Sequence, residues 1–244
     1  MVFMDMIIIS SVDNYSPDEL KILVESLNNV GYNGTKIMIT HDVYDITTEY
    51  LNENGWVTIN ISLDMLQHIQ RYKNASDILK DYPNDYVLFI DCRDVYFNLN
   101  PEEWNLDSDL YVGVDGFMKT KSHSWGKENM MKSFPDFYPT IENETHLNCG
   151  VVYGKGSLMV NFLNDVYETS LKSNQRQNLD PHDFTPDDQM ALNVMVYTKY
   201  KDQIRIQDVN DRFFINMAQT KWDGKMDYYL YHQYDRVESF QYLF

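Results

Sequence analysis

The chain has 244 residues, of which 43% are hydrophobic and 23% charged, a composition that excludes a disordered chain and predicts one folded domain. Its 20 basic and 37 acidic residues give a formal net charge of −17. A protein of that charge repels phosphate backbones and anionic membrane surfaces, which argues against nucleic-acid and membrane partners. It also repels a nucleotide diphosphate, so a nucleotide site would need a metal ion or well-placed arginine and lysine side chains.

Two further features bear on the compartment. Cys92 and Cys149 are the two cysteines, too few for a disulfide framework and consistent with free thiols in a reducing environment. The apolar run over residues 6–9 is too short for a signal-peptide core or a membrane span, and no other stretch is long enough to cross a bilayer. We therefore expect a cytoplasmic protein without a membrane span.

Alternating strand-like and helix-like segments predict an α/β fold with a largely parallel sheet. Ser16, followed by Pro17 and by Glu19 three residues later, is a helix-start signal. The run over residues 86–90 is apolar throughout, typical of a central strand buried on both sides. In the first half we expect helices from residue 17 to about 31 and over 64–80, and strands over 6–12, 36–40, 56–61 and 86–90.

The second half of the sequence is less regular. Residues 115–146 lack periodicity and are rich in aromatic and polar side chains, so we expect a long functional loop there. We expect one domain over residues 1–244, with about 1–100 as its nucleotide-binding half and about 101–244 as its substrate-facing half. The remaining predicted elements are strands over 110–114, 151–153, 205–209 and 228–231 and helices over 158–171 and 187–200.

The clearest chemical signal is an apolar strand that ends in acidic residues, Asp91 and Asp94. Ligands in open α/β sheets bind beyond the carboxyl ends of strands, and carboxylates there can bind a hard divalent cation. Arg93 could orient a neighbouring carboxylate. A solvent-exposed acidic turn would explain the same residues, so spacing alone leaves both interpretations open.

Residues 91–97, DCRDVYF, resemble the Asp-x-Asp segment of GT-A glycosyltransferases in a variant that reads Asp-x-Arg-Asp-Val. The other segments that agree, in order, are Arg71-Tyr72, LNCGVVYG at 147–154, PDDQ at 186–189 with Asn193, and LYHQYDR at 230–236. Together they resemble the small glycosyltransferase domains of large algal DNA viruses and related bacterial sugar transferases, over residues 6–236. One departure is that Arg93 stands where the motif has its second acid, so which carboxylate contacts the metal and which the ribose is open.

The resemblance implies a GT-A fold, with a Rossmann-like nucleotide-binding half, a mixed central sheet and an acceptor-binding second half. It implies a glycosyltransferase that moves a sugar from a UDP- or GDP-sugar to a glycan or another hydroxyl acceptor, in the host cytoplasm if the protein is viral. Mn²⁺ (or Mg²⁺) would be held by Asp91, Asp94 and His232. Apart from the resemblance, His232 could be an inert histidine among neighbouring tyrosines.

Two adjacent acids, Asp187 and Asp188, are the catalytic candidates. The resemblance favours Asp188, which precedes Gln189. In an inverting enzyme it would be the general base that takes the proton of the acceptor hydroxyl; in a retaining enzyme it would stabilise the oxocarbenium-like transition state. Acids at a helix start also complement the helix dipole, which would explain both residues without catalysis.

The donor-binding candidates share positions near the ends of predicted strands or on the helix before the central strand: Ser11, Asp13, Arg71, Asp91, Arg93 and Asn148. In this fold the base and ribose lie where the first strand ends, although Asp13 could simply form a turn with Asn14. Arg71 could offset the acidic field, or it could be an exposed charge paired with Asp77. Asn148 could donate to a sugar hydroxyl or be a polar residue at a strand entry.

Other chemistries lack their motifs. The sequence contains no Gly-x-Gly-x-x-Gly turn after the first strand, no phosphate-binding Gly-x-x-x-x-Gly-Lys loop, no Cys/His pattern for structural zinc and no Gly-x-Ser-x-Gly elbow. A nucleotidyltransferase is an alternative enzyme, but residues 10–16 supply no basic, glycine-rich loop. A non-catalytic nucleotide-sugar-binding module is the other alternative. The aromatic residues that could stack on acceptor sugars, or form the core of a lid, are Trp125, Phe134, Phe137 and Tyr138.

Overall fold

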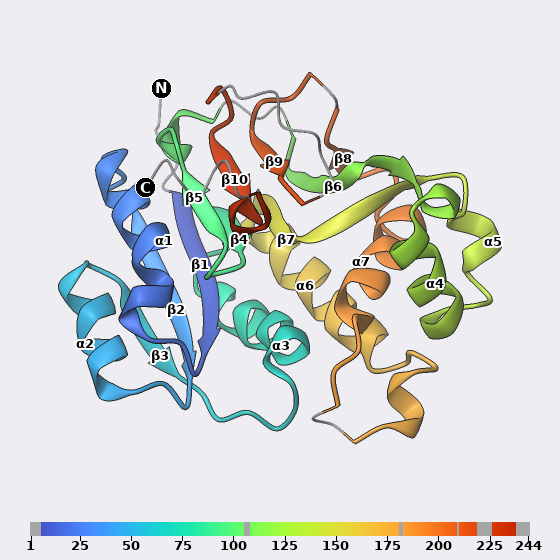
Figure 1. Ribbon diagram of the computed structural model, residues 1–244, viewed down its shortest axis with the longest axis horizontal. Helices are drawn as coiled ribbons and strands as arrows, with labels where there is room; N and C mark the ends of the chain where they lie inside the picture. The colour runs from blue at the N-terminus through green and yellow to red at the C-terminus, as the bar shows by residue number, and fades with distance from the viewer. Residues whose placement is uncertain (1–5, 105–107, 181–182, 209, 219–225, 238–244) are drawn as a thin grey trace.

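The computed structural model describes residues 6–104, 108–180, 183–208, 210–218 and 226–237. They are arranged around a seven-stranded sheet of order β3-β2-β1-β4-β7-β6-β8 (Figure 1). All pairs are parallel except β4–β7 and β6–β7, so β7 runs against the other six strands. This confirms an α/β fold with a mixed, largely parallel sheet. The strands are β1 Met6–Asp13, β2 Thr35–His41, β3 Val57–Asn60, β4 Tyr86–Ile90, β6 Leu110–Lys119, β7 Thr145–Lys155 and β8 Arg205–Ile206.

A second, three-stranded sheet has the order β5-β10-β9. Its strands are β5 Val95–Phe97, β9 Phe214–Asn216 and β10 Leu230–His232. The helices are α1 Pro17–Asn29, α2 Asp45–Glu53, α3 Gln67–Leu79, α4 Ser124–Ser133, α5 Tyr138–Ile141, α6 Gly156–Ser170 and α7 Asp187–Tyr197. Short 3-10 turns cover Pro101–Glu103, Thr120–Ser122, Arg176–Asn178 and Tyr234–Arg236.

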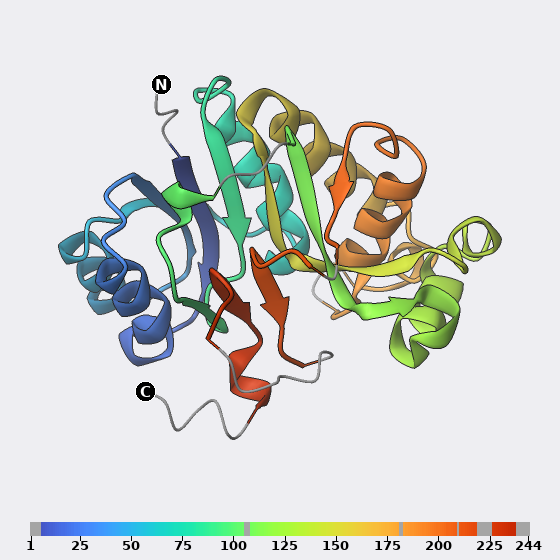
Figure 2. The ribbon, with the colours of Figure 1, turned by 90° about the horizontal axis from the view of Figure 1, so that it is seen from above.

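The elements form layers on the two faces of the large sheet. Helices α3, α6 and α7 pack against one another over one face, and α1, α2 and the small sheet lie over the other (Figure 2). Strands from both halves of the chain join in the large sheet, since β1–β4 come from the first half and β6–β8 from the second. The sheet therefore brings side chains from distant parts of the sequence to one edge.

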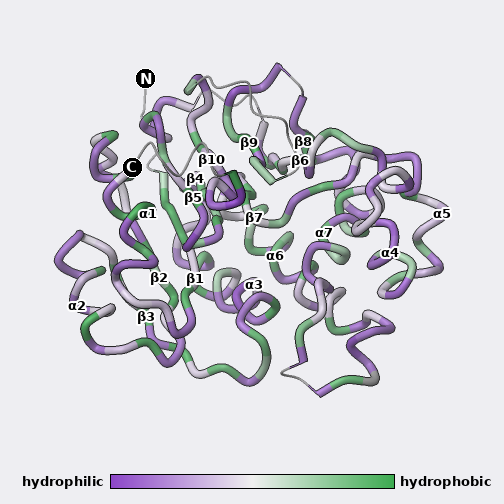
Figure 3. The backbone as a smooth tube through the Cα atoms, in the orientation of Figure 1, coloured by the Kyte–Doolittle hydropathy of each residue, from purple (hydrophilic) through white to green (hydrophobic). Residues whose placement is uncertain are grey.

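Helix α1 shows how local sequence sets an element. The side chain of Glu19 accepts hydrogen bonds from the backbone N–H and the hydroxyl of Ser16, both at 2.9 Å, which completes the predicted capping box. The buried face repeats at helical spacing, and the tube in Figure 3 changes between hydrophobic and hydrophilic along the helix. That face consists of Leu20, Leu23, Val24, Ser26 and Leu27.

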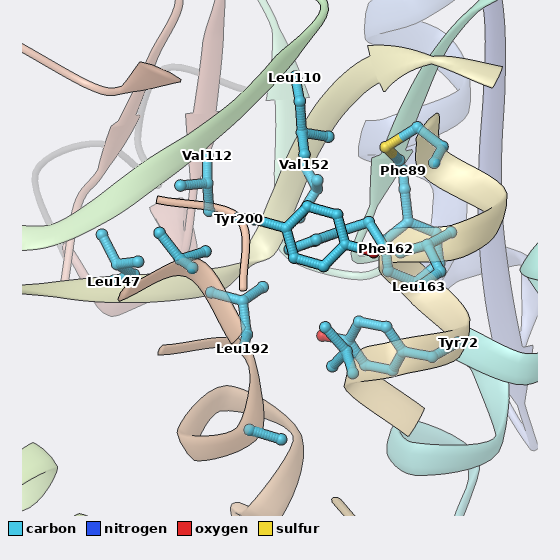
Figure 4. Close-up of a cluster of buried hydrophobic side chains, with 14 of the residues drawn as sticks. Tyr72, Phe89, Leu110, Val112, Leu147, Val152, Phe162, Leu163, Leu192 and Tyr200 are labelled. Carbon is cyan, nitrogen blue, oxygen red and sulfur yellow. The ribbon is translucent and has the colours of Figure 1, made fainter. Parts of the chain in front are cut away.

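Strand β4 is buried on both sides, as its apolar run predicts. Val87 and Phe89 belong to the core below α3 and α6, while Leu88 and Ile90 face the core beneath α1. A shift of one residue would exchange the two faces, so packing fixes the register and the position where β4 ends. Figure 4 shows the first of these cores, with Tyr72, Phe89, Leu110, Val112, Leu147, Val152, Phe162, Leu163, Leu192 and Tyr200 labelled.

The prediction of a long irregular loop over 115–146 is wrong. Strand β6 continues to Lys119, β7 begins at Thr145, and α4 and α5 lie between them. Helix α4 buries only Gly126, Met130 and Ser133, so it lacks the apolar stripe by which periodicity reveals a helix. Two further differences concern strands. The strand expected over 205–209 ends at residue 206, with residue 209 outside the described residues, and the last strand covers 230–232 rather than 228–231.

Candidate metal centre

Three elements bring the predicted metal ligands to one edge of the large sheet. Asp91 directly follows β4, and its backbone N–H donates to the carbonyl of Gly150 in β7 at 2.9 Å. His232 is the last residue of β10, and the N–H of Gln233 donates to the carbonyl of Asp94 at 2.7 Å. These backbone bonds fix the acidic segment after β4 against both neighbouring strands.

The side chains of Asp91, Asp94 and His232 form a compact group. Nε2 of His232 lies 3.1 Å from a carboxylate oxygen of Asp91 and 3.6 Å from one of Asp94. One ligand atom from each residue lies within 4.8 Å of the other two. Neighbouring ligands of a small divalent cation are about 3 Å apart. The structure therefore brings together the three predicted ligands in a group that could hold a metal ion.

The charges of this group depend on one another. Burial favours a raised pKa for Asp91, but Arg71 and His232 outweigh it and hold the pKa well below its usual range. Burial raises the pKa of Asp94. The nearby His232 lowers it by a smaller amount, so the pKa stays raised. Burial lowers the pKa of His232, but the two carboxylates outweigh it and the pKa is raised. A proton on His232 thus partly neutralises the pair, and a bound cation would take over that function.

A buried arginine, Arg71, supports the metal centre from α3. Its guanidinium forms an ion pair with Asp91, and its Nη2 lies 3.6 Å from the carboxylate of Asp188. It packs over the rings of Tyr72 and Phe89, 5.2 Å from each centroid. The alternative partner Asp77 instead pairs with Lys73 and Lys80 on the surface. Arg71 therefore connects a predicted metal ligand with a predicted catalytic carboxylate.

The two adjacent aspartates at the start of α7 point to different places. Asp188 lines the cavity described below, 3.6 Å from the thiol of Cys149. Asp187 is fully buried and is not among the residues that line that cavity. Its carboxylate is held inside the protein by Ser133, Ser173, Arg176 and Thr185.

A cavity of about 810 Å³ opens at this edge of the sheet. All the predicted donor-binding residues line this cavity: Ser11, Asp13, Arg71, Asp91, Arg93 and Asn148. Asp13, the last residue of β1, also accepts a hydrogen bond from the side chain of Asn14 at 2.6 Å, and the backbone bends at Asn14. Arg93 is partly exposed and pairs with Asp235 at 3.2 Å. Asn148 lies within β7, not at its entry, and accepts from the N–H of Gly150 at 2.8 Å.

The cavity wall is acidic. Its lining residues include five aspartates and three arginines, and Arg71 is already paired with two of those aspartates. A divalent cation would cancel the remaining formal charge of the wall. The acidic cavity wall is thus a place where a bound nucleotide diphosphate would need the positive charge of a metal ion, as the net charge of the sequence predicts.

Sequence reasoning missed two features of the site. Gly150 stands so close to the metal centre that a Cβ there would lie 2.3 Å from the ring of His232 and 2.7 Å from Asp91. Asp115, which was assigned to a loop, lies in β6 and lines the cavity. Asp115 has no signal in the sequence, because a lone aspartate near a strand is common. Gly150 belongs to the segment 147–154 that carries part of the resemblance, but its place at the metal centre was not predicted.

The aromatic residues proposed for acceptor stacking divide between two places. Trp125 lines the large cavity and is 42% exposed. Phe134 and Phe137 instead line a separate cavity of about 330 Å³ beside α6 and α7. Phe184 was not predicted, yet it lines the large cavity and is 75% exposed. Trp125 and Phe184 are therefore the exposed aromatic surfaces of the candidate site.

Comparison with known proteins adds no relative. No family model matches the chain, and a search of curated proteins gave no match. Within the described residues, no helix combines the length and the apolar character needed to cross a bilayer.

Proposed function

We propose that the protein is a metal-dependent glycosyltransferase of the GT-A type, which transfers a sugar from a nucleoside diphosphate sugar, a UDP- or GDP-sugar, to a hydroxyl of a glycan or similar acceptor. The observation that carries the proposal is the group of Asp91, Asp94 and His232 beside a cavity of about 810 Å³ at the strand ends. The resemblance of five sequence segments to that family supports the same reaction.

The ligand set favours Mn²⁺ over Mg²⁺. Mg²⁺ prefers oxygen ligands in strict octahedral geometry, whereas Mn²⁺ accepts an imidazole beside carboxylates. When bound, such a cation acts as a Lewis acid that stabilises the negative charge on the leaving diphosphate. Arg71 holds the carboxylate of Asp91 in place for this, in the manner of outer-shell groups that orient metal ligands.

The remaining lining residues fit the two substrates. Ser11 and Asp13 at the end of β1 would contact the nucleoside, and Arg93 and Asn148 the phosphate or sugar groups of the donor. Asp188 would receive the proton of the acceptor hydroxyl in an inverting reaction, or stabilise positive charge at the anomeric carbon in a retaining one.

The first test is donor hydrolysis and transfer across a panel of nucleotide sugars, with Mn²⁺ and with EDTA. We expect turnover only with the cation. Asp94→Asn should lower metal-dependent turnover by at least about 100-fold while leaving the circular dichroism spectrum unchanged. Asp45→Asn is the matched control, because Asp45 is an exposed aspartate at the start of α2, and it should retain wild-type turnover.

The same measurements separate the alternatives. A nucleotidyltransferase would release pyrophosphate from a nucleoside triphosphate and a sugar phosphate. A binding module would show calorimetric binding of a nucleotide sugar without any turnover. Turnover that EDTA does not affect would rule out the proposed function of the metal centre.

A further inference from the structure

A second group of metal-ligating side chains lies apart from Asp91, Asp94 and His232. Asp115 in β6, His123 at the start of α4 and His146 in β7 place one ligand atom each within 4.8 Å of the others. Their exposed fractions are 5%, 2% and 0%. The two imidazole rings face each other with centroids 4.6 Å apart.

Two ring nitrogens of this group have no hydrogen-bond partner in the described part of the chain. They are Nε2 of His123 and Nδ1 of His146, both buried. Buried polar atoms are almost always satisfied by protein, water or an ion, so each exception needs an explanation. Nε2 of His123 lies 3.4 Å from a carboxylate oxygen of Asp115, close to the separation of about 3.3 Å between neighbouring ligands of tetrahedral zinc.

The surroundings of the group suit a bound cation. Asp115 accepts hydrogen bonds from Asn216 at 2.8 Å and from Gln189 at 3.1 Å. Such outer partners fix the orientation of a ligating carboxylate.

Two contacts oppose metal binding. The side-chain amide of Gln189 lies 3.3 Å from Nε2 of His146 and also donates to Asp115, so a cation ligated by both residues would have to displace it. Nδ1 of His123 accepts the N–H of Gly126 at 3.0 Å, which caps α4, and ligation through Nε2 of His123 with a proton on Nδ1 would break that cap. The loss of one helix cap is small beside the binding free energy of a zinc site.

We propose that Asp115, His123 and His146 form a second metal site, suited to Zn²⁺. Two imidazoles and one carboxylate are a zinc ligand set that leaves the fourth position to a water or another group. Trp125 meets both rings edge-on, with centroids 6.3 Å from each. The bound cation would therefore fix the start of α4 and the indole of Trp125 in the cavity wall.

The proposal is tested by metal stoichiometry, because that measurement does not depend on activity. Protein stripped with a chelator is dialysed against Zn²⁺ and its bound metal counted, in the Asp94→Asn background so that the first centre does not contribute. We expect one Zn²⁺ per chain, a rise in melting temperature with Zn²⁺, and with Co²⁺ a visible absorption band of a tetrahedral site. His146→Gln and Asp115→Asn, each added to Asp94→Asn, should abolish all three.

Each result has a defined meaning. Asp115→Asn keeps the shape of its side chain and serves if the histidine variant fails to fold. The proposal is overturned if Asp94→Asn protein takes up no Zn²⁺, or if the added substitutions leave the uptake unchanged. Loss of Mn²⁺-dependent turnover in Asp94→Asn is a separate readout, so the proposed glycosyl transfer can fail while the zinc site stands.

Discussion

At the residue scale, neighbours in sequence can have opposite surroundings. Asp187 is enclosed among polar side chains of the protein interior, 3.4 Å from the guanidinium of Arg176. Asp188, one residue later, reaches the cavity and lies 3.6 Å from Arg71. A substitution that removes only the charge should therefore affect folding at one position and chemistry at the other.

We predict that Asp187→Asn lowers the free energy of unfolding by about 3 kcal/mol, because it breaks a buried ion pair. Asp188→Asn should instead lower transfer by about 100-fold or more, with a smaller loss of stability because Arg71 keeps its ion pair with Asp91. Urea denaturation and turnover of the two variants check both statements. Full transfer activity in folded Asp188→Asn would remove this residue from the mechanism.

Metal affinity should depend on pH through His232. Its pKa is raised by the two neighbouring carboxylates, and the cation needs the neutral ring, so binding expels a proton. Mn²⁺ affinity is therefore expected to fall as the pH drops below that raised pKa, by up to about tenfold per pH unit, and to be level above it. Calorimetric titration of Mn²⁺ over pH checks this, and the slope should vanish in His232→Gln.

At the element scale, the close approach of β7 to β10 decides the geometry of the metal centre. A Cβ on Gly150 would lie 2.3 Å from the ring of His232, so we predict that Gly150→Ala displaces the imidazole. The expected result is a loss of Mn²⁺ affinity of about 10- to 100-fold, measured by calorimetry, in a protein whose circular dichroism is unchanged. Wild-type affinity in that variant would show that the ring has room to move.

Sequence patterns predicted those elements whose signals lie in consecutive residues of the chain. The apolar run of β4 and its acidic end placed Asp91 at the edge of the sheet, and the capping residues placed the start of α1. The partner of Arg71 could not be found in this way, because Asp91 is 20 residues away and approaches only when α3 packs on β4.

Other features escaped prediction because they arise from long-range pairing. Asp115, His123 and His146 have no metal-ligand spacing in the sequence, and they meet only because β6 pairs with β7. Asp187 and Asp188 could not be separated either, since which of two adjacent helical side chains faces a cavity depends on what packs against α7. Helix α4 went unrecognised since most of its surface is exposed.

At the scale of the whole molecule, the net charge of −17 opposes any anionic substrate. We predict that a nucleoside diphosphate binds the metal-free protein more tightly as NaCl rises from about 20 to about 200 mM, because salt screens the repulsion between protein and ligand. With saturating Mn²⁺ the dependence should be much weaker. Calorimetry or fluorescence titration at several salt concentrations measures this. Weakening of metal-free binding by salt would contradict the prediction.

Strand β7 enters the sheet at the cavity edge, where β1 and β4, which run antiparallel to it, leave the sheet. The segment between β6 and β7 therefore departs from this edge and returns to it, carrying α4 and α5. Its two ends are joined, with the N–H of Thr120 donating to the carbonyl of Glu144 at 2.8 Å. Because the two ends of this segment are hydrogen-bonded to each other, the segment could be lengthened or exchanged without disturbing the sheet. If the proposed glycosyl transfer holds, this segment is where a change of length or sequence would alter the cavity wall around Trp125 and leave the metal centre in place.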